Sequence, residues 1–175
     1  MAKRGELVLN EYFDFTQKKL VQPHKLASFA AEVRKQNKRL VTLNGSFDLL
    51  HAGHLHIIHE ASKQGDVLLV ALNSDASIKR YKSPKRPIIG LRDRLTMMSA
   101  LSFVTNVTWF EQDDPRDLLE IVQPDVHVNG QDWGSECIES EVVKKYGGKL
   151  HIVSLVPGLS TSKIIERIHE TSSPV

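Results

Sequence analysis

The sequence has few of the features that mark secreted, membrane or fibrous proteins. Its 175 residues include one cysteine, Cys137, so no disulfide can form within the chain. Hydrophobic residues make up 41% of the sequence, but no apolar run approaches the roughly 20 residues that a membrane-spanning helix needs. Charged residues stand near the amino terminus, where a signal peptide has an apolar core. These absences predict a cytoplasmic protein with no membrane partner.

Strong charge of either sign is also missing. The chain has 23 lysines and arginines against 21 aspartates and glutamates, a formal net charge of +2. This balance is too weak for the basic footprint of a nucleic-acid-binding protein. Two common phosphate-binding patterns are absent as well, namely Gly-x-x-x-x-Gly-Lys-Ser/Thr and a Gly-x-Gly-x-x-Gly run after a strand. The sequence therefore disfavours P-loop ATPases and dinucleotide-dependent dehydrogenases.

Short apolar runs alternate with helical patterns from residue 40 onward. This alternation predicts an α/β fold with a doubly wound, parallel, five-stranded sheet and helices on both faces. The predicted strands are Leu40 to Leu43, Val67 to Leu72, Asn106 to Phe110, Val126 to Val128 and Leu150 to Leu155. The predicted helices between and after them are Gly53 to Gln64, Leu91 to Leu101, Asp114 to Val122, Ile138 to Tyr146 and Thr161 to His169.

The length allows one main domain, which we assign to residues 38–170. Residues 1–37 are predicted to form an N-terminal arm followed by a helix packed on that domain. The helix spans Pro23 to Lys35, where apolar residues recur at helical spacing. Residues 171–175 are predicted to be a frayed tail.

A phosphate-binding junction is predicted where the first strand meets its helix. The strand runs through a turn, Asn44 to Leu50, into His51-Ala52-Gly53-His54 at the start of a helix. A helix N-terminus presents unpaired N–H groups and a partial positive charge, which attract phosphate. His51 and His54 lie three residues apart, so they share one helix face and can both donate to one polyphosphate. Gly45 allows a close backbone approach, and Gly53 leaves room for a nucleotide.

Clustered histidines can also bind zinc, but no His-Glu-x-x-His occurs and no cysteine or carboxylate completes a ligand set at metal spacing. We therefore predict no protein-bound metal. His56 and His59 fall on another side of the same helix and are expected to be solvated. The remaining histidines are treated as structural; they are His24, His127, His151 and His169.

The turn and the His-x-Gly-His run resemble the signature of the cytidylyltransferase-like nucleotidyltransferases, a Rossmann-like group. Within that group the chain is most similar to the D-glycero-β-D-manno-heptose 1-phosphate adenylyltransferases, from about Lys38 to Ile168. The shared segments are Gly45 to His54, Ala71 to Ser77, Lys82 with Arg86-Pro87-Ile88, Arg94, Val128 to Trp133 and Leu159 to Ile164. The resemblance makes residues 38–170 a nucleotidyltransferase domain.

The resemblance implies roles for individual residues. The expected catalytic residues are His51, His54, Lys82 and Arg94, which would hold and neutralise the reacting phosphates. The expected nucleotide- and substrate-binding residues are Gly45, Ser46, Phe47, Asn73, Asp75, Gly130, Asp132, Trp133, Ser160, Thr161 and Ser162. Ser46 departs from the family, which has cysteine or threonine at this position.

Several of these residues also have plainer interpretations. Lys82 lies in a basic run that could be a solvated loop, in which Lys79 and Lys85 are alternatives to it. Arg94 could be a surface residue paired with Asp93 or Asp114. Asp132-Trp133 could form a turn with a packing tryptophan.

The expected function is transfer of AMP from ATP to D-glycero-β-D-manno-heptose 1-phosphate, giving ADP-heptose and pyrophosphate, with Mg²⁺ accompanying ATP. This reaction belongs to lipopolysaccharide core synthesis. The alternatives are a cytidylyltransferase acting on glycerol 3-phosphate or another alcohol phosphate, and a non-catalytic nucleotide-binding module. The heptose enzyme is often fused to a sugar kinase that 175 residues cannot contain, so the kinase is expected on a separate protein. Many relatives are dimers, which leaves a homodimer as an open alternative.

Overall fold

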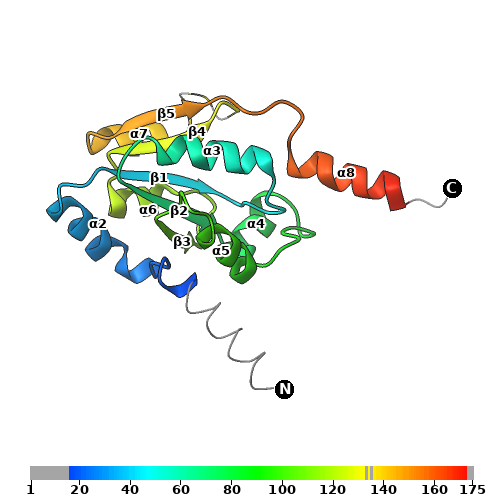
Figure 1. Cartoon of the computed structure of the whole chain (residues 1–175), viewed down its shortest axis with the longest axis horizontal. Coiled ribbons are helices and arrows are strands. Elements are labelled where there is room, and N and C mark those ends of the chain that lie inside the picture. Colours follow the sequence, from blue (N-terminus) through cyan, green and yellow to red (C-terminus); the bar gives the residue numbers. More distant parts are fainter. Residues whose placement is uncertain (1–15, 133, 135, 173–175) are drawn as a thin grey trace, which may run out of the picture.

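A parallel five-stranded sheet forms the centre of the molecule, in the order β3-β2-β1-β4-β5 (Figure 1). The computed structural model describes residues 16–132, 134 and 136–172. The strands are β1 (Leu40–Gly45), β2 (Val67–Asn73), β3 (Asn106–Phe110), β4 (Val126–Gly130) and β5 (Lys149–Val153). All four strand pairs are parallel. The predicted α/β fold with a doubly wound sheet is confirmed.

Helices cover both faces of the sheet. One apolar cluster joins α3 (Ala52–Ser62) and α5 (Leu91–Ser99) to inward side chains such as Leu43 and Val70. The opposite cluster joins α2 (Leu26–Lys35), α6 (Arg116–Val122) and α7 (Glu139–Lys145) to Leu69 and Ala71. Neighbouring residues of one strand thus serve different clusters, because side chains alternate along a strand. The near-continuous apolar sequence of β2 follows from this two-sided burial.

One short helix was not predicted from the sequence, and the start of another has a different form. Helix α4 (Asp75–Tyr81) has only seven residues, too few to show a clear helical period, and the Ser74 side chain caps it by accepting from Ser77 N. A 3₁₀ turn, η1 (Pro23–Lys25), occupies the start of the predicted helix before α2. Helix α4 immediately precedes Lys82, one of the predicted site residues.

The C-terminal helix α8 (Thr161–Ser172) extends away from the sheet (Figure 1). None of its residues is buried. Ser160 Oγ accepts from Lys163 N and so caps its first turn. The helix includes residues 171 and 172 of the predicted frayed tail, and residues 173–175 lie outside the described part.

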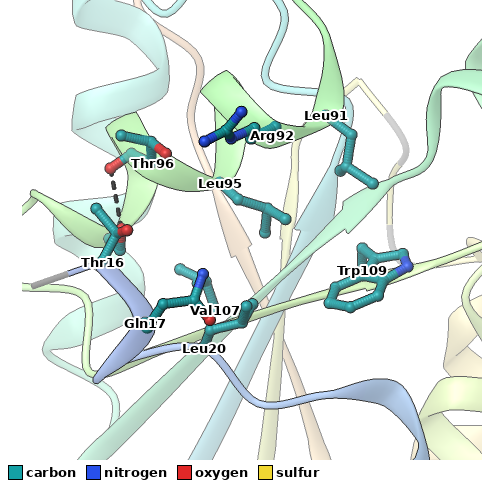
Figure 2. Close-up of a pocket in the computed structure, with 10 residues that line it drawn as sticks. Thr16, Gln17, Leu20, Leu91, Arg92, Leu95, Thr96, Val107 and Trp109 are labelled. Carbon is teal, nitrogen blue, oxygen red and sulfur yellow. Dashed lines mark hydrogen bonds between the residues drawn. The ribbon is translucent and has the colours of Figure 1, made fainter. Parts of the chain in front are cut away.

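The segment before α2 runs along the outer strand β3. Leu20 forms a parallel bridge with Val107, and Lys19 Nζ donates to the carbonyls of Leu101 and Val104. Between this segment, α5 and β3 lies an apolar cavity of about 330 Å³, shown in Figure 2. The predicted arm, residues 1–15, lies outside the described residues.

One histidine is buried in the sheet itself. His127 of β4 is fully buried, and its Nδ1 shares a hydrogen bond of 2.8 Å with Thr42 Oγ1 of β1. Its Nε2 has no partner among the described residues. Burial lowers the pKa of His127 to about 3, so the ring is neutral near pH 7. A buried ring that stays neutral cross-links two strands and does no acid–base chemistry at physiological pH.

The low pKa of His127 predicts an acid-sensitive fold. The unfolded imidazole takes up a proton below its ordinary pKa of 6.5, whereas the folded ring stays neutral until about 3. The contribution of His127 to the free energy of unfolding is therefore fully present above pH 6.5. It falls as the pH drops below that value, by up to about 1.4 kcal/mol per pH unit for one proton. Urea unfolding between pH 7 and 5 should show a flatter pH dependence for His127→Gln than for the unsubstituted protein. Equal slopes would contradict this.

Candidate active site

A cleft of about 580 Å³ opens at the carboxyl ends of the strands. It is lined from the ends of β1, β2 and β4, from the loop after β5 and from the starts of α3 and α8. Strands β1 and β4 are neighbours, although β2 and β3 lie on one side of β1 and β5 lies beyond β4. The chain thus reverses its winding direction between β1 and β4. Such a switch point is where open α/β sheets bind ligands.

The turn after β1 shapes the floor of this cleft. Phe47 and Leu49 adopt left-handed conformations, with φ of 45° and 52°. Bulky residues rarely adopt such angles, and they occur mostly where the surrounding structure imposes them. A Cβ on Gly45 would lie 3.1 Å from the buried Phe47 ring. Glycine at this position therefore lets the turn fold back on its own strand.

The two predicted histidines stack at the start of α3. Their ring centroids lie 3.8 Å apart with an interplanar angle of 21°, and His51 occupies the N-cap position. Nδ1 of each ring is buried without a partner among the described residues. A Cβ on Gly53 would lie 3.0 Å from His51 Cε1 and 3.2 Å from Leu159 Cβ. Gly53 therefore leaves room for the His51 ring and for the loop before α8.

Both histidines are poor bases in this position. Burial lowers the pKa of His51. Burial also lowers the pKa of His54 to about 4, helped by the nearby charges of His51 and Lys82. Both rings are therefore neutral near pH 7, and each carries one N–H donor. An anion beside them would favour their protonated forms and raise both pKa values.

Lys82 lies across the cleft from the histidines. It follows α4, and its Nζ donates to Ser46 Oγ over 2.7 Å. Partial burial and the nearby Arg86 lower the pKa of Lys82. Lys82 lines the cleft, whereas Lys79 and Lys85 do not. Of the three lysines that the sequence offered, Lys82 is the one placed to meet a phosphate.

The buried carboxylate of Asp48 holds the loop that follows Lys82. The sequence analysis assigned no role to this residue. Asp48 accepts from Arg86 Nε and Nη2 at 2.7 and 2.6 Å, and from the backbone amides of Ile88 and Ile89 at 2.9 Å. Burial alone would raise the pKa of Asp48, but these donors outweigh it and lower that pKa. The ion pair keeps Arg86 at the cleft wall. The shared segment Gly45 to His54 contains Asp48, but the sequence does not show that Asp48 pairs with Arg86, 38 positions away.

Arg94 does not line the cleft. Its side chain is fully buried, and its guanidinium donates to three carbonyls, those of Ser46, Asn73 and Ile89, at 2.6 to 2.9 Å. Nη2 also pairs with Asp75 Oδ1 at 2.7 Å. The interpretation of Arg94 as a surface residue paired with Asp93 or Asp114 is wrong. Arg94 lies behind the cleft wall, and its partner Asp75 is partly exposed outside the cleft, so the expected contact of either residue with substrate has no geometric support.

The other predicted site residues that the structure describes reach the cleft. They are Gly45, Ser46, Phe47, Asn73, Gly130, Asp132, Ser160, Thr161 and Ser162. Thr161 Oγ1 donates to the Asp48 carbonyl over 2.9 Å and so ties the start of α8 to the β1 turn. The Asn73 amide donates to Ser77 Oγ. Trp133 lies outside the described residues.

Comparison with known proteins agrees with this geometry. The family model described as "Cytidylyltransferase-like" matches residues 42–169, which include every segment of the cleft. The chain belongs to the cytidylyltransferase-like family. Membership makes it a nucleotidyltransferase domain, as the His-x-Gly-His motif predicted.

Among curated members of the cytidylyltransferase-like family, two relatives are named "Bifunctional protein HldE". The protein from Syntrophotalea carbinolica is 43% identical over 136 residues, covering 77% of this chain and 28% of the relative. The protein from Geotalea uraniireducens is 44% identical over 148 residues, covering 84% and 30% respectively. The chain therefore spans less than a third of these relatives.

Two solved structures share the fold. A lipopolysaccharide core biosynthesis protein from Thermoplasma volcanium has a TM-score of 0.55 and 29% identity, covering 68% of this chain and 97% of its own. A pantoate-beta-alanine ligase from Francisella tularensis, determined with an ATP analogue and beta-alanine, has a TM-score of 0.56 and 14% identity, covering 86% and 77%. The second likeness supports the fold alone.

Because Arg94 is buried and does not line the cleft, its replacement is expected to lower the free energy of unfolding and not to act directly on the chemical step. Arg94→Met should lower the free energy of unfolding by about 3 kcal/mol, because it leaves buried carbonyls without donors. The exposed pair of Arg80 with Asp113 supplies a control, since Arg80→Met should cost under about 1 kcal/mol. Both values come from urea titration. Unchanged stability with greatly reduced turnover in Arg94→Met would instead indicate contact with the reacting phosphates.

Proposed function

We propose that the protein transfers AMP from ATP to D-glycero-β-D-manno-heptose 1-phosphate, forming ADP-heptose and pyrophosphate. The observation that carries this proposal is the stacked pair of His51 and His54 at a helix N-terminus, which line the same cleft as Lys82. Such an arrangement suits a polyphosphate. The similarity to HldE proteins supports an adenylyltransferase role.

The chemistry requires no covalent enzyme intermediate. An oxygen of the sugar phosphate attacks the α-phosphorus of ATP, a new P–O bond forms, and the bond from that phosphorus to the bridging oxygen breaks in line. Pyrophosphate leaves with the electron pair of the broken bond. His51 and His54 donate to the phosphate oxygens on which charge grows, and Lys82 offsets the repulsion between the two anions.

Magnesium would enter with ATP. No group of three His, Cys, Asp or Glu side chains suited to a metal ion occurs in the part of the chain that the structure describes. Mg²⁺ usually retains several waters and binds phosphate oxygens directly, so a dedicated protein cage is not required. The ion would neutralise the leaving pyrophosphate.

The wall beside Gly53 suits a nucleoside. Leu155, Val156 and Leu159, from the loop after β5, line the cleft beside Gly130. A Cβ on Gly130 would lie 2.5 Å from Asp132 Oδ1 and 3.2 Å from Leu155 Cδ2. Apolar side chains and glycine provide a flat surface for a base, and Asp132 provides an acceptor for ribose hydroxyls.

The proposed roles predict a large catalytic defect in the histidine variants. His51→Ala and His54→Ala should each lower kcat by about 100-fold or more, since each removes one donor to the developing charge. Pyrophosphate release with ATP and the heptose phosphate measures this. His56→Ala and His59→Ala are the matched controls on the same helix and should retain near-normal turnover. Normal turnover in both His51→Ala and His54→Ala would rule out the phosphate-site assignment.

The loop after β5 predicts the preferred substrate pair. The glycerol 3-phosphate cytidylyltransferases that share His-x-Gly-His carry an arginine shortly before their Ser-Thr-Thr motif, whereas residues 154–159 contain no cation. A neutral loop does not replace a guanidinium at an anion site. With Mg²⁺ present, kcat/KM should be higher for ATP with heptose 1-phosphate than for CTP with glycerol 3-phosphate. A tenfold change in kcat/KM corresponds to about 1.4 kcal/mol, roughly the effect of one lost charged contact. A preference of tenfold or more for CTP with glycerol 3-phosphate would overturn the heptose assignment and leave the nucleotidyltransferase assignment in place.

A further inference from the structure

The cleft continues past the histidines onto the face of the sheet that carries α6 and α7. Because side chains alternate along a strand, Asn44 and Asn129 point to this face, opposite to Leu43 and Val128 in the cluster under α3. Both asparagines line the cleft. The strand ends therefore contribute amide side chains to this side of the cleft.

Glu139, the first residue of α7, brings a carboxylate to the same wall. It is only 4% exposed although it lines the cleft. Asn129 Nδ2 donates to Glu139 Oε2 over a long 3.4 Å, and within the described residues no cationic side chain pairs with Glu139. A buried carboxylate is costly unless donors reach it. The Cys137 side chain also shares a hydrogen bond with Glu139. A carboxylate can accept about four hydrogen bonds, so Glu139 can still accept from a bound molecule.

A second acceptor stands on this wall. Oδ1 of Asn44 is buried and has no hydrogen-bond partner among the described residues. Buried polar atoms are usually paired in native proteins, and exceptions tend to mark functional positions. Glu139 and the Asn44 amide together therefore bring polar groups to this wall, which suits a molecule that carries several hydroxyls.

Charge decides which part of a substrate can lie here. Asp113 and Asp114 also line the cleft, where Arg80 and Arg116 pair with them, so they add no free positive charge that would hold a phosphate. Lys82 and Arg86 lie at the other end, beside the β1 turn. A molecule with hydroxyls at one end and a phosphate at the other fits with its hydroxyls toward Glu139. The apolar wall of Leu155 and Leu159 lies opposite and accounts for the base.

We infer that Glu139, with Asn44 and Asn129, forms the subsite that binds the hydroxyl groups of the acceptor sugar. The inference rests on the proposed function, which makes a sugar phosphate the acceptor. It adds specificity-determining residues that the motifs did not indicate. Hydroxyl groups are suited to this wall because each one donates to a carboxylate or amide oxygen and accepts from an amide N–H.

Steady-state kinetics with ATP and D-glycero-β-D-manno-heptose 1-phosphate test this subsite. In Glu139→Gln and Glu139→Ala the KM for the sugar phosphate should rise about 10- to 100-fold, the loss expected for a hydrogen bond to a charged group. The KM for ATP should change by less than about twofold, which is smaller than the change expected when a hydrogen bond to a charged group is lost. Glu141→Gln is the matched control, because Glu141 lies exposed on the same helix.

A second variant and a set of substrate analogues distinguish loss of a substrate contact from a change in the protein structure. Asn44→Val removes the unpartnered acceptor and should raise the same KM selectively. Deoxy analogues of the heptose phosphate identify the hydroxyl concerned. One analogue should be a poor substrate for the unsubstituted protein yet lose little further efficiency with Glu139→Ala, because that variant has already lost the contact. Calorimetric titration with ATP shows whether each variant remains folded.

The outcomes separate the subsite from the proposed function. Turnover by the unsubstituted protein, with an unchanged sugar KM in Glu139→Ala and Asn44→Val, would overturn the subsite alone. A selective rise in the KM for ATP would overturn it too, by assigning Glu139 to the nucleotide. A Glu139→Ala variant that no longer binds ATP, with Glu139→Gln and Asn44→Val unaffected, would make Glu139 structural. Absence of turnover with every sugar phosphate would overturn both proposals.

Discussion

The site depends above all on the buried guanidinium of Arg94. Its planar fork reaches the end of β1 at Ser46, the end of β2 at Asn73 and the loop before α5 at Ile89. Backbone carbonyls at strand ends have no partner within a parallel sheet, and burying them unpaired would be costly. Arg94 satisfies three of them at once and so makes the carboxyl edge of the sheet a rigid wall. Only a side chain with several donors in a fixed plane can do this.

The parts of the cleft are attached to that edge by a second set of buried contacts. The Asp48 carboxylate holds the loop carrying Arg86, and the Asp48 carbonyl receives Thr161 at the start of α8. Two segments that are distant in sequence thus meet at the turn after β1. Its left-handed residues Phe47 and Leu49 are held in place by these contacts, which explains how bulky side chains occupy such conformations.

The cleft separates its charges. Neutral histidines, Lys82 and Arg86 occupy the end near the β1 turn, whereas Glu139 and the aspartates before α6 occupy the other end. In the proposed function, Lys82 and Arg86 attract the phosphate of the substrate to the first end, which helps to orient a substrate that has a phosphate at one end. The cytidylyltransferase-like sheet supplies the edge, and side chains from α4 and α7 supply this polarity.

Much of the molecule was determined by the sequence alone. Apolar runs with helical patterns between them specify a parallel sheet, because both faces of each strand must be buried. The His-x-Gly-His run at a helix start predicts a phosphate site, and local backbone geometry places both rings side by side. Other features depended on the tertiary structure. Arg94 looks like any helix-surface arginine until folding buries it, and Asp48 and Glu139 have partners or surroundings from distant segments. Burial and long-range pairing arise only when the chain is packed, so a linear pattern cannot distinguish a residue that contacts substrate from one that supports the wall behind it.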